Sequence, residues 1–322
     1  MLKFIQDRYK RFVRIGSLAC ILLTVIANPE FVYSQQEPQF SQYMFNRLSY
    51  NPGYAGSNGA ICLTGFYRNQ WMGMGLTDVY GEASSASTGE TMNLSFDMPV
   101  RFLHGGIGAT IISDKIGFRD NIHAKIDYAF RIQFPTGNLA IGIEAQLFNS
   151  TLDMGALIGS DQFTEDDQVG TSLDPVLGNA AEQSDFLFDL GAGIYYQIPG
   201  KLYIGLSTSK IMQTSSDNLY WDNRRFYYIL AGYEWALPAY PSLRLLPSAL
   251  LKTDFISKSA YQVDASLLME WEHKIWGGMT YRVQDAMVLM GGVAFGDFKL
   301  GVSYDIPTSR ISTQSAGSLE LF

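Results

Sequence analysis

The residue types that could carry chemistry in this chain are few and widely spaced. Histidine occurs only at His104, His123 and His273. His123 precedes Lys125 and Asp127 at intervals of two, which would place the three side chains on one face of a strand. With one of the abundant serines, such a set could form a hydrolase site. A metal site needs three or four converging ligands, and histidines this far apart predict none.

A polar network inside a barrel is the alternative for His123, and the surrounding pattern favours it. The same network is predicted to include Glu270, Glu272, Arg282 and Lys299, since opposite charges on neighbouring strands lie within reach of each other. We therefore predict no catalytic residue, no cofactor-binding residue and no metal ligand. Unchanged activity of a His123→Ala variant would exclude the hydrolase hypothesis.

An acidic stretch of low periodicity covers residues 155–185. It contains seven carboxylates together with several glycines and one proline. A calcium site is one possibility, but the carboxylates do not have the alternating spacing of an EF-hand loop. A long solvated loop, of the kind that outer-membrane barrels place outside the cell, fits better.

Aromatic and glycine-rich positions also admit two interpretations. The candidates for a ligand cage are better explained as interfacial girdle residues at strand ends, namely Trp71, Trp221, Trp271, Trp276 and Tyr281. Gly291 and Gly292 lack the strand, turn and helix context of a phosphate-binding loop. They are predicted to allow close packing.

The elements that would position these residues are strands. Alternate residues from Tyr261 to Trp271 are apolar and most residues between them are polar, which is the period of a strand. Three more strand patterns follow, ending at Ile306. Short turns join them and predict an antiparallel meander, because parallel pairing needs a crossover of about a dozen residues or more.

Similar alternation predicts nine earlier strands and one at the end of the chain, about fourteen in all. Several reach ten residues, which is long enough to cross hydrocarbon when tilted. Pro247 interrupts the predicted strand 243–255 and indicates a bulge, since proline donates no ladder hydrogen bond. The nine earlier ranges are 60–71, 91–100, 105–118, 121–134, 139–151, 186–198, 202–212, 224–237 and 243–255.

Residues 1–34 have the pattern of a secretory signal peptide. Five basic residues precede an uncharged run from Ile15 to Ala27, and small or apolar residues lead up to Ser34. We expect cleavage near Ser34. An anchor helix is the alternative, but it would need about 20 consecutive apolar residues. Cys20 does not fit a lipoprotein site, because the apolar run continues beyond it.

Composition excludes several classes of protein. Residues 1–34 hold five basic and two acidic side chains, so their removal would change the formal net charge from −8 to −11, which disfavours nucleic acid binding. Only Cys62 would remain, so no intrachain disulfide could form. Hydrophobic residues make up 47% and charged residues only 17%, against about 25% charged in soluble domains. An exported chain of this kind, without a long apolar helix, favours a closed transmembrane sheet over a soluble sandwich.

We therefore predict an all-β fold: an antiparallel transmembrane β-barrel of about fourteen strands over residues 60–322, with apolar side chains facing lipid. A signal peptide (1–34) and a non-barrel segment (35–59) precede it. This segment lacks strand periodicity, and Asn51, Pro52 and Gly53 mark turns in it. We expect it to lie against or inside the mouth of the barrel.

Several motifs resemble the PorP/SprF membrane proteins of the type IX secretion system of Bacteroidetes. They are Gln39–Asn46, Asn51–Gly56, Tyr67–Trp71, Phe226–Tyr228, Ala231–Tyr233, Leu246–Lys252, Tyr304–Asp305 and Thr308–Arg310. Gly53 stands where the family usually has alanine, and Leu319 where it usually has histidine. The last strand stops several residues short of the family's usual length, from which we expect the sequence to be truncated.

The resemblance implies a non-enzymatic component of the outer membrane. Such a protein would contact membrane lipid, dock periplasmic ring or lipoprotein components of the machinery, or support export and surface attachment of adhesin-like cargo. It implies no cofactor and no small-molecule substrate. The polar inner face alone would also fit a passive channel or a transporter of hydrophobic solutes, and the pattern leaves open whether the lumen is open or plugged.

Overall fold

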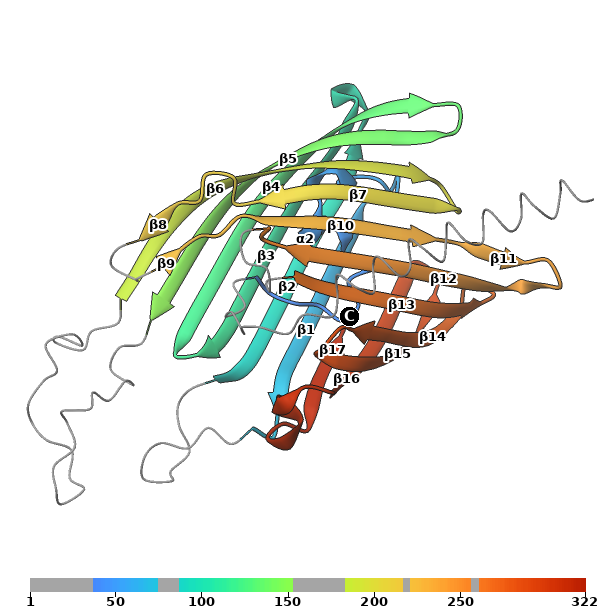
Figure 1. Ribbon diagram of the computed structural model, residues 1–322. Helices are drawn as coiled ribbons and strands as arrows, with labels where there is room; N and C mark the ends of the chain where they lie inside the picture. The colour runs from blue at the N-terminus through green and yellow to red at the C-terminus, as the bar shows by residue number, and fades with distance from the viewer. Residues whose placement is uncertain (1–36, 75–86, 153–182, 217–220, 256–260) are drawn as a thin grey trace, which may run out of the picture.

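The computed structural model describes residues 37–74, 87–152, 183–216, 221–255 and 261–322 as a ring of tilted strands around a short inner stretch of chain (Figure 1). The predicted signal peptide and most of the predicted acidic loop 155–185 lie outside these residues. No helix within the described ranges is long and apolar enough to span a membrane.

Strands make up most of the described chain, and helices are short. The helices are α2 (Arg47–Tyr50), η1 (Pro52–Tyr54), η2 (Arg101–Leu103) and η5 (Arg310–Thr313). The strands are β1 (Cys62–Met72), β2 (Ser87–Val100), β3 (Gly105–Gly117), β4 (Arg119–Phe134), β5 (Gly137–Leu152), β6 (Gln183–Ile198), β7 (Leu202–Ser209), β8 (Ser215–Ser216), β9 (Trp221–Asp222), β10 (Phe226–Tyr233), β11 (Trp235–Leu237), β12 (Tyr240–Thr253), β13 (Tyr261–Trp271), β14 (Ile275–Arg282), β15 (Ala286–Phe295), β16 (Phe298–Pro307) and β17 (Gly317–Leu321).

The sheet is a meander that closes on itself. Each wall strand pairs antiparallel with its neighbours in sequence, and β17 pairs antiparallel with β1 to complete the ring. If β10 and β11 are counted as one interrupted strand, the described wall has fourteen strands. The predicted all-β barrel of about fourteen strands is confirmed. The small pair β8–β9 stands apart from the wall, between the predicted strands 202–212 and 224–237.

Pro247 does not form the predicted bulge. The register between β12 and β10–β11 is the same on both sides of it, with Ser248 opposite Gly232 and Leu245 opposite Trp235. Between these pairs the ladder is interrupted, which is where β10 ends and β11 begins. Because proline has no N–H to donate, the wall loses pairing at this point without gaining an extra residue.

The two faces of the wall have the polarity of a membrane barrel. On β4, the apolar side chains of Ile122 and Ile126 are 49% and 69% exposed, whereas the charged side chains of Lys125 and Asp127 are 4% and 1% exposed. This is the reverse of a soluble sandwich, in which the apolar face is buried. Apolar side chains that face outward and polar side chains that face the lumen are what a lipid environment requires.

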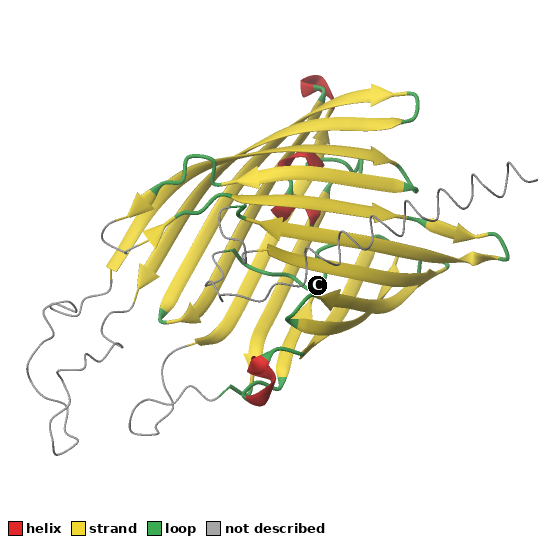
Figure 2. Ribbon diagram, in the orientation of Figure 1, coloured by secondary structure: helices red, strands yellow, loops and turns green. Residues whose placement is uncertain are grey.

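The two rims of the barrel differ. At one rim, here called the short-turn end, two or three residues join β4 to β5, β6 to β7 and β15 to β16. At the other, the long-loop end, the connections β1–β2, β5–β6 and β7–β10 are much longer. Figure 2 shows α2 and η1 inside the ring and η2 and η5 at opposite rims.

Candidate functional site

The lumen is occupied by the chain itself. Residues 37–57, here called the inner segment, run through the barrel before β1 begins (Figure 1). Every side chain from Glu37 to Gly56 is buried except those of Phe45, Arg47 and Ser49, which are half-buried. The path runs from the long-loop end, where Glu37 contacts Lys210, to the short-turn end, where Gly56 contacts Asp97.

A buried ionic cluster holds the inner segment at Ser41 and Gln42. It joins the segment to five described strands through residues that are at most 2% exposed, and we call it the seam cluster: Ser41, Arg68, Asp264, Arg282, Asp305 and Glu320. Asp305 accepts from Arg68 at 2.8 Å and from Arg282 at 2.9 Å. Ser41 Oγ lies between them, donating to Asp305 at 2.7 Å and accepting from Arg68 at 2.7 Å.

Glu320 on β17 binds the backbone of the inner segment. Its carboxylate accepts the N–H groups of Ser41 at 2.7 Å and Gln42 at 2.8 Å, and it also pairs with Arg68 at 3.3 Å. Hydrogen bonds with one charged partner are about twice as strong as neutral ones. The three carboxylates of the seam cluster are therefore compensated by two guanidinium groups and by donors from the inner segment.

A second set of charges holds the start of the inner segment. Glu37 pairs with Lys210 at 2.8 Å, and Lys252 Nζ donates to the Glu37 carbonyl at 3.1 Å. Burial by itself would raise the pKa of the Glu37 carboxyl group. The nearby positive charges of Lys210 and Lys125 outweigh this effect and lower the pKa to about 2. The Glu37 carboxylate is therefore ionised and attracts the lysines around it.

His123, Lys125 and Asp127 all face the lumen, as the period of two predicts, but no hydrogen bond joins the three. His123 Nδ1 lies 2.7 Å from Gln146 Nε2, and Lys125 pairs with Glu144 at 3.3 Å. The Asp127 carboxylate has no hydrogen-bond partner in the described chain. Among the described residues, these three side chains therefore do not form a hydrogen-bonded relay toward a serine. Across the described ranges, no three His, Cys, Asp or Glu side chains are placed to hold a metal ion.

The predicted single network of Glu270, Glu272, Arg282 and Lys299 is wrong, because these residues divide among three places. Glu270 faces the lumen and lies 3.9 Å from Lys299, whereas Arg282 belongs to the seam cluster. Glu272 lies in the β13–β14 turn with a positive φ of 48° and pairs with Lys274 near the surface. The alternation of β13 ends at Trp271, whereas the prediction had extended it to Glu272.

Trp276 was predicted to be a girdle residue, and this is also wrong. Its side chain is only 3% exposed and packs in the lumen on Phe45, with ring centroids 4.8 Å apart. Added side chains at Gly292 or Gly301 would overlap the Trp276 ring. The close packing predicted for Gly291 and Gly292 is therefore found at Gly292, whereas a Cβ at Gly291 would make only an ordinary contact. The alternation along β14 already indicated that Trp276 faces the lumen, since it lies on the same face of the strand as Thr280 and Arg282.

Other members of the predicted girdle do face outward. Trp271 is 51% exposed at the short-turn end of β13, and Tyr281 is 50% exposed near the long-loop end of β14. Phe295 and Phe298 are also exposed at the short-turn end. Aromatic residues at both rims are typical of a barrel at the two membrane interfaces.

A row of lumen-facing glycines seats the turn at Asn51. A Cβ atom at Gly142 on β5 would overlap the backbone of Pro52 and Gly53, and one at Gly193 on β6 would overlap the Asn51 side chain. Asn51 Nδ2 donates to the carbonyls of Ile194 and Leu206 on neighbouring strands at 3.1 and 3.2 Å. The wall is thus shaped to the backbone of the inner segment, and only glycine permits this approach.

This fit predicts a specific cost for one methyl group. A Gly142→Ala variant should lower the free energy of unfolding by about 1–3 kcal/mol, because the backbone at residues 52–53 must move. Gly277→Ala is the matched control, since a Cβ there makes only an ordinary contact with the Met290 carbonyl at 3.5 Å. Guanidinium titration in detergent, followed by tryptophan fluorescence, measures both variants. Equal midpoints would contradict the proposed seating of the segment.

The end of the inner segment is fixed at the short-turn end. Arg131 donates to the carbonyls of Gly56 at 2.9 Å and Ala55 at 2.8 Å. Asp97 accepts the Gly56 N–H at 2.9 Å, and Gln197 donates to the Ser57 carbonyl at 2.8 Å. Three different strands therefore hold the last turn of the segment before β1.

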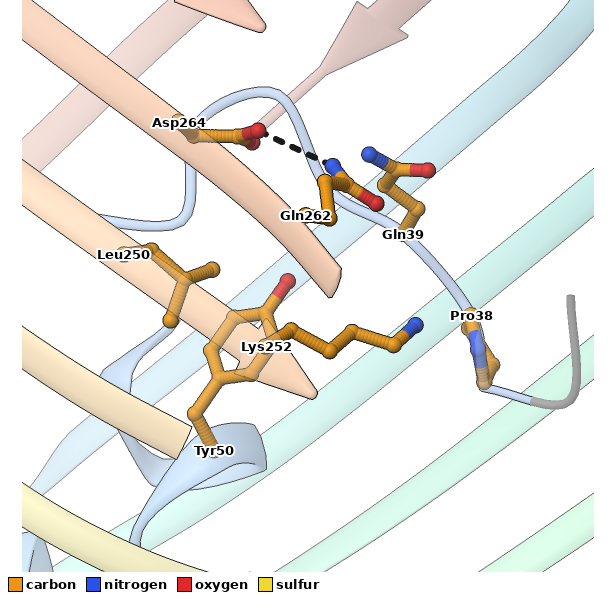
Figure 3. A pocket seen from close by; sticks show the side chains of 7 residues that line it. All are labelled: Pro38, Gln39, Tyr50, Leu250, Lys252, Gln262 and Asp264. Atoms are coloured by element: carbon orange, nitrogen blue, oxygen red, sulfur yellow. Dashed lines mark hydrogen bonds between the residues drawn. The ribbon is translucent and has the colours of Figure 1, made fainter. Parts of the chain in front are cut away.

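A small cavity lies beside the start of the inner segment. The cavity in Figure 3 has a volume of about 10 Å³, room for about one water molecule. The inner segment contributes Pro38, Gln39 and Tyr50 to its lining, and Gln262 donates to Asp264 at 2.9 Å beside it. A drug-sized ligand needs a pocket of several hundred Å³, so this cavity does not accommodate one.

Comparison with known proteins gives the family. The sequence model of the family described as "Type IX secretion system membrane protein PorP/SprF" matches residues 32–322. The chain belongs to the PorP/SprF family. No curated protein matches the chain.

Solved structures of membrane barrels are similar to this PorP/SprF protein at low identity. A crystal structure of a Pseudomonas aeruginosa FadL homologue is 10% identical, covers 81% of this chain and 88% of that chain, and has a TM-score of 0.38. Two mutants of the Rh. blastica porin are 8% and 9% identical, each covering 81% of this chain and 98% of that chain, with TM-scores of 0.31 and 0.32. These values carry no functional argument, and the fold rests on the strand pairings described above.

The motifs that indicated PorP/SprF membership converge in the lumen. Ser41 and Gln42 come from the first motif, Asn51 from the second, Arg68 from the third and Asp305 from a later one. They are separated by up to 264 residues in sequence, as for Ser41 and Asp305. These motif residues thus hold the inner segment in the lumen, a role that the sequence did not indicate.

Proposed function

We propose that this PorP/SprF protein is a non-enzymatic outer-membrane component of the type IX machinery that docks other subunits or secreted cargo at its rims. The observation that carries the proposal is the filled lumen. A barrel whose interior is occupied over its depth by its own chain offers its rims and loops, rather than a transport path, for contact with partners.

The orientation follows from the two rims. Outer-membrane barrels have short turns on the periplasmic side and long loops on the extracellular side. The short-turn end would therefore face periplasmic ring or lipoprotein components of the machinery. The long-loop end would face secreted adhesin-like protein, and it is the end at which β5 stops and β6 starts.

The filled lumen favours docking over the alternative of a passive channel or hydrophobic-solute transporter. Buried polar contacts at Glu37, Ser41, Asn51 and Gly56 hold the inner segment along its whole length. An open channel would require this segment to leave or to rearrange. The cavity beside Pro38, Gln39 and Tyr50 has room for about one water molecule and not for a solute.

The test of the docking function is made in the host that carries the gene. A tagged full-length protein, purified from outer membranes in mild detergent, is expected to retain type IX machinery subunits or secreted cargo, identified by mass spectrometry against an untagged control. Deletion of the gene is expected to reduce surface export or attachment of at least one secreted protein, and complementation should restore it. Unchanged export together with no retained machinery protein would overturn the proposal.

A further inference from the structure

We propose that the inner segment clamps the barrel closed at the seam, defined as the pairing of β1 with β17. This inference concerns how the ring is held together and does not depend on the docking function. It is carried by the position of the seam cluster, which has members on both strands of the seam and on the inner segment between them.

The seam differs from the other wall pairings in one respect. Every other pair of wall neighbours is consecutive along the chain, whereas β1 and β17 are separated by more than 240 residues. Closing a long loop costs conformational entropy that a hairpin largely avoids. The pairing of β1 with β17 therefore depends more on added contacts than a hairpin does.

Contacts across the seam converge on the inner segment. Arg68 on β1 and Glu320 on β17 are directly opposite in the ladder, and Asp305 lies on β16 at the other side of β17. Ser41 bonds to all three of these side chains, through its Oγ to Arg68 and Asp305 and through its N–H to Glu320. One residue of the inner segment thus connects three adjacent strands, including both strands of the seam.

The segment also satisfies charges that the seam would otherwise leave buried. Without Ser41 and Gln42, the Glu320 carboxylate would lose two backbone donors and keep only Arg68, at 3.3 Å. A buried carboxylate that lacks hydrogen-bond donors is costly. The Ser41 side chain adds the contacts that a substitution can remove, since its Oγ bonds Arg68 on β1 and Asp305 on β16. Their loss should loosen Arg68 and weaken β1–β17 pairing before it weakens distant parts of the wall.

Ser49 provides a matched control in the same segment. Its hydroxyl donates to Asn46 at 2.7 Å and accepts from Asn93 on β2 at 2.9 Å. These partners lie away from β17 and carry no charge. Ser41→Ala and Ser49→Ala remove the same atom from the inner segment, but only the first acts on the seam cluster.

Hydrogen exchange of the full-length barrel in detergent, read by mass spectrometry, tests the proposal. In Ser41→Ala, peptides covering β1 and β17 are expected to exchange at least about tenfold faster than in the parent, because one hydroxyl with several charged partners is lost. Peptides covering β4 and β5 should be unchanged. In Ser49→Ala, the β1 and β17 peptides should exchange as in the parent.

Two results would overturn the clamp. One is parental exchange of β1 and β17 in Ser41→Ala. The other is equal acceleration of the seam peptides and the β4–β5 peptides, which would indicate general loosening rather than opening at the seam. A pair of cysteines at the opposed positions Asn69 and Leu319, in a Cys62→Ser background, gives an independent check. Oxidation of this pair should suppress the faster exchange of Ser41→Ala at the seam.

Discussion

An Arg68→Met variant is expected to lose about 3–5 kcal/mol of its free energy of unfolding, the usual cost of removing one partner from a buried ion pair. Arg68 is 1% exposed, forms ion pairs with Asp305 and Glu320, and donates a hydrogen bond to Ser41. Methionine has similar bulk but no donor, so Glu320 would lose the cation that the described residues place within 4 Å of it. Guanidinium titration in detergent measures the loss.

The control for this prediction is an exposed ion pair of the same protein. Lys115 and Asp120 lie 3.1 Å apart with side chains about half exposed. A Lys115→Met variant should change the free energy of unfolding by less than about 1 kcal/mol, because solvent screens an exposed pair. Arg68→Lys should fall between the two, since it keeps the charge but loses the two-pronged donor. Similar losses for Arg68→Met and Lys115→Met would contradict the role assigned to the seam cluster.

The second large effect is expected on conductance. In planar bilayers the parent protein should show no steady channel, whereas a variant lacking residues 37–56 should show discrete conductance steps. A wall of fourteen strands lies between eight-stranded barrels, which side chains fill, and porins of 16–18 strands, which hold an aqueous channel. Removing twenty residues from such a lumen should leave a continuous aqueous path.

The deletion could also impair folding, so a second protein separates folding from plugging. Residues 58–60 are exposed at the rim, and a protease site placed there lets the inner segment be cut after the barrel has formed. Release of the cut segment in mild denaturant, followed by reconstitution, should produce the same conductance. Steady conductance of the parent, or a folded and emptied barrel that does not conduct, would show that the inner segment is not what closes the lumen.

The Arg68→Met substitution and the deletion of residues 37–56 change different parts of the barrel. Arg68→Met weakens the wall while the segment is still present, and the deletion empties the lumen. If the segment clamps the seam, the deletion should also lower stability, and the cysteine pair at Asn69 and Leu319 should restore part of it. A conducting barrel of parental stability would support plugging without clamping.

The sequence by itself determined the strands and the direction in which their faces point. Alternation along β4 and β13 depends only on neighbouring residues, and a strand's side chains must alternate between its two faces. Composition then decided that the apolar face meets lipid. The wrong prediction for Trp276 could have been avoided from the sequence, because the alternation along β14 already placed Trp276 with Arg282 on the lumenal face.

Only the tertiary structure decided what fills the lumen. The inner segment has no periodicity, so nothing in its own sequence fixes its path. Its position depends on glycine gaps at Gly142 and Gly193 and on charges at Arg68, Asp305 and Glu320, which come together only when the ring closes. Local alternation sets which way a side chain points, but contacts between residues hundreds of positions apart exist only in the closed barrel, and these contacts hold the segment inside it.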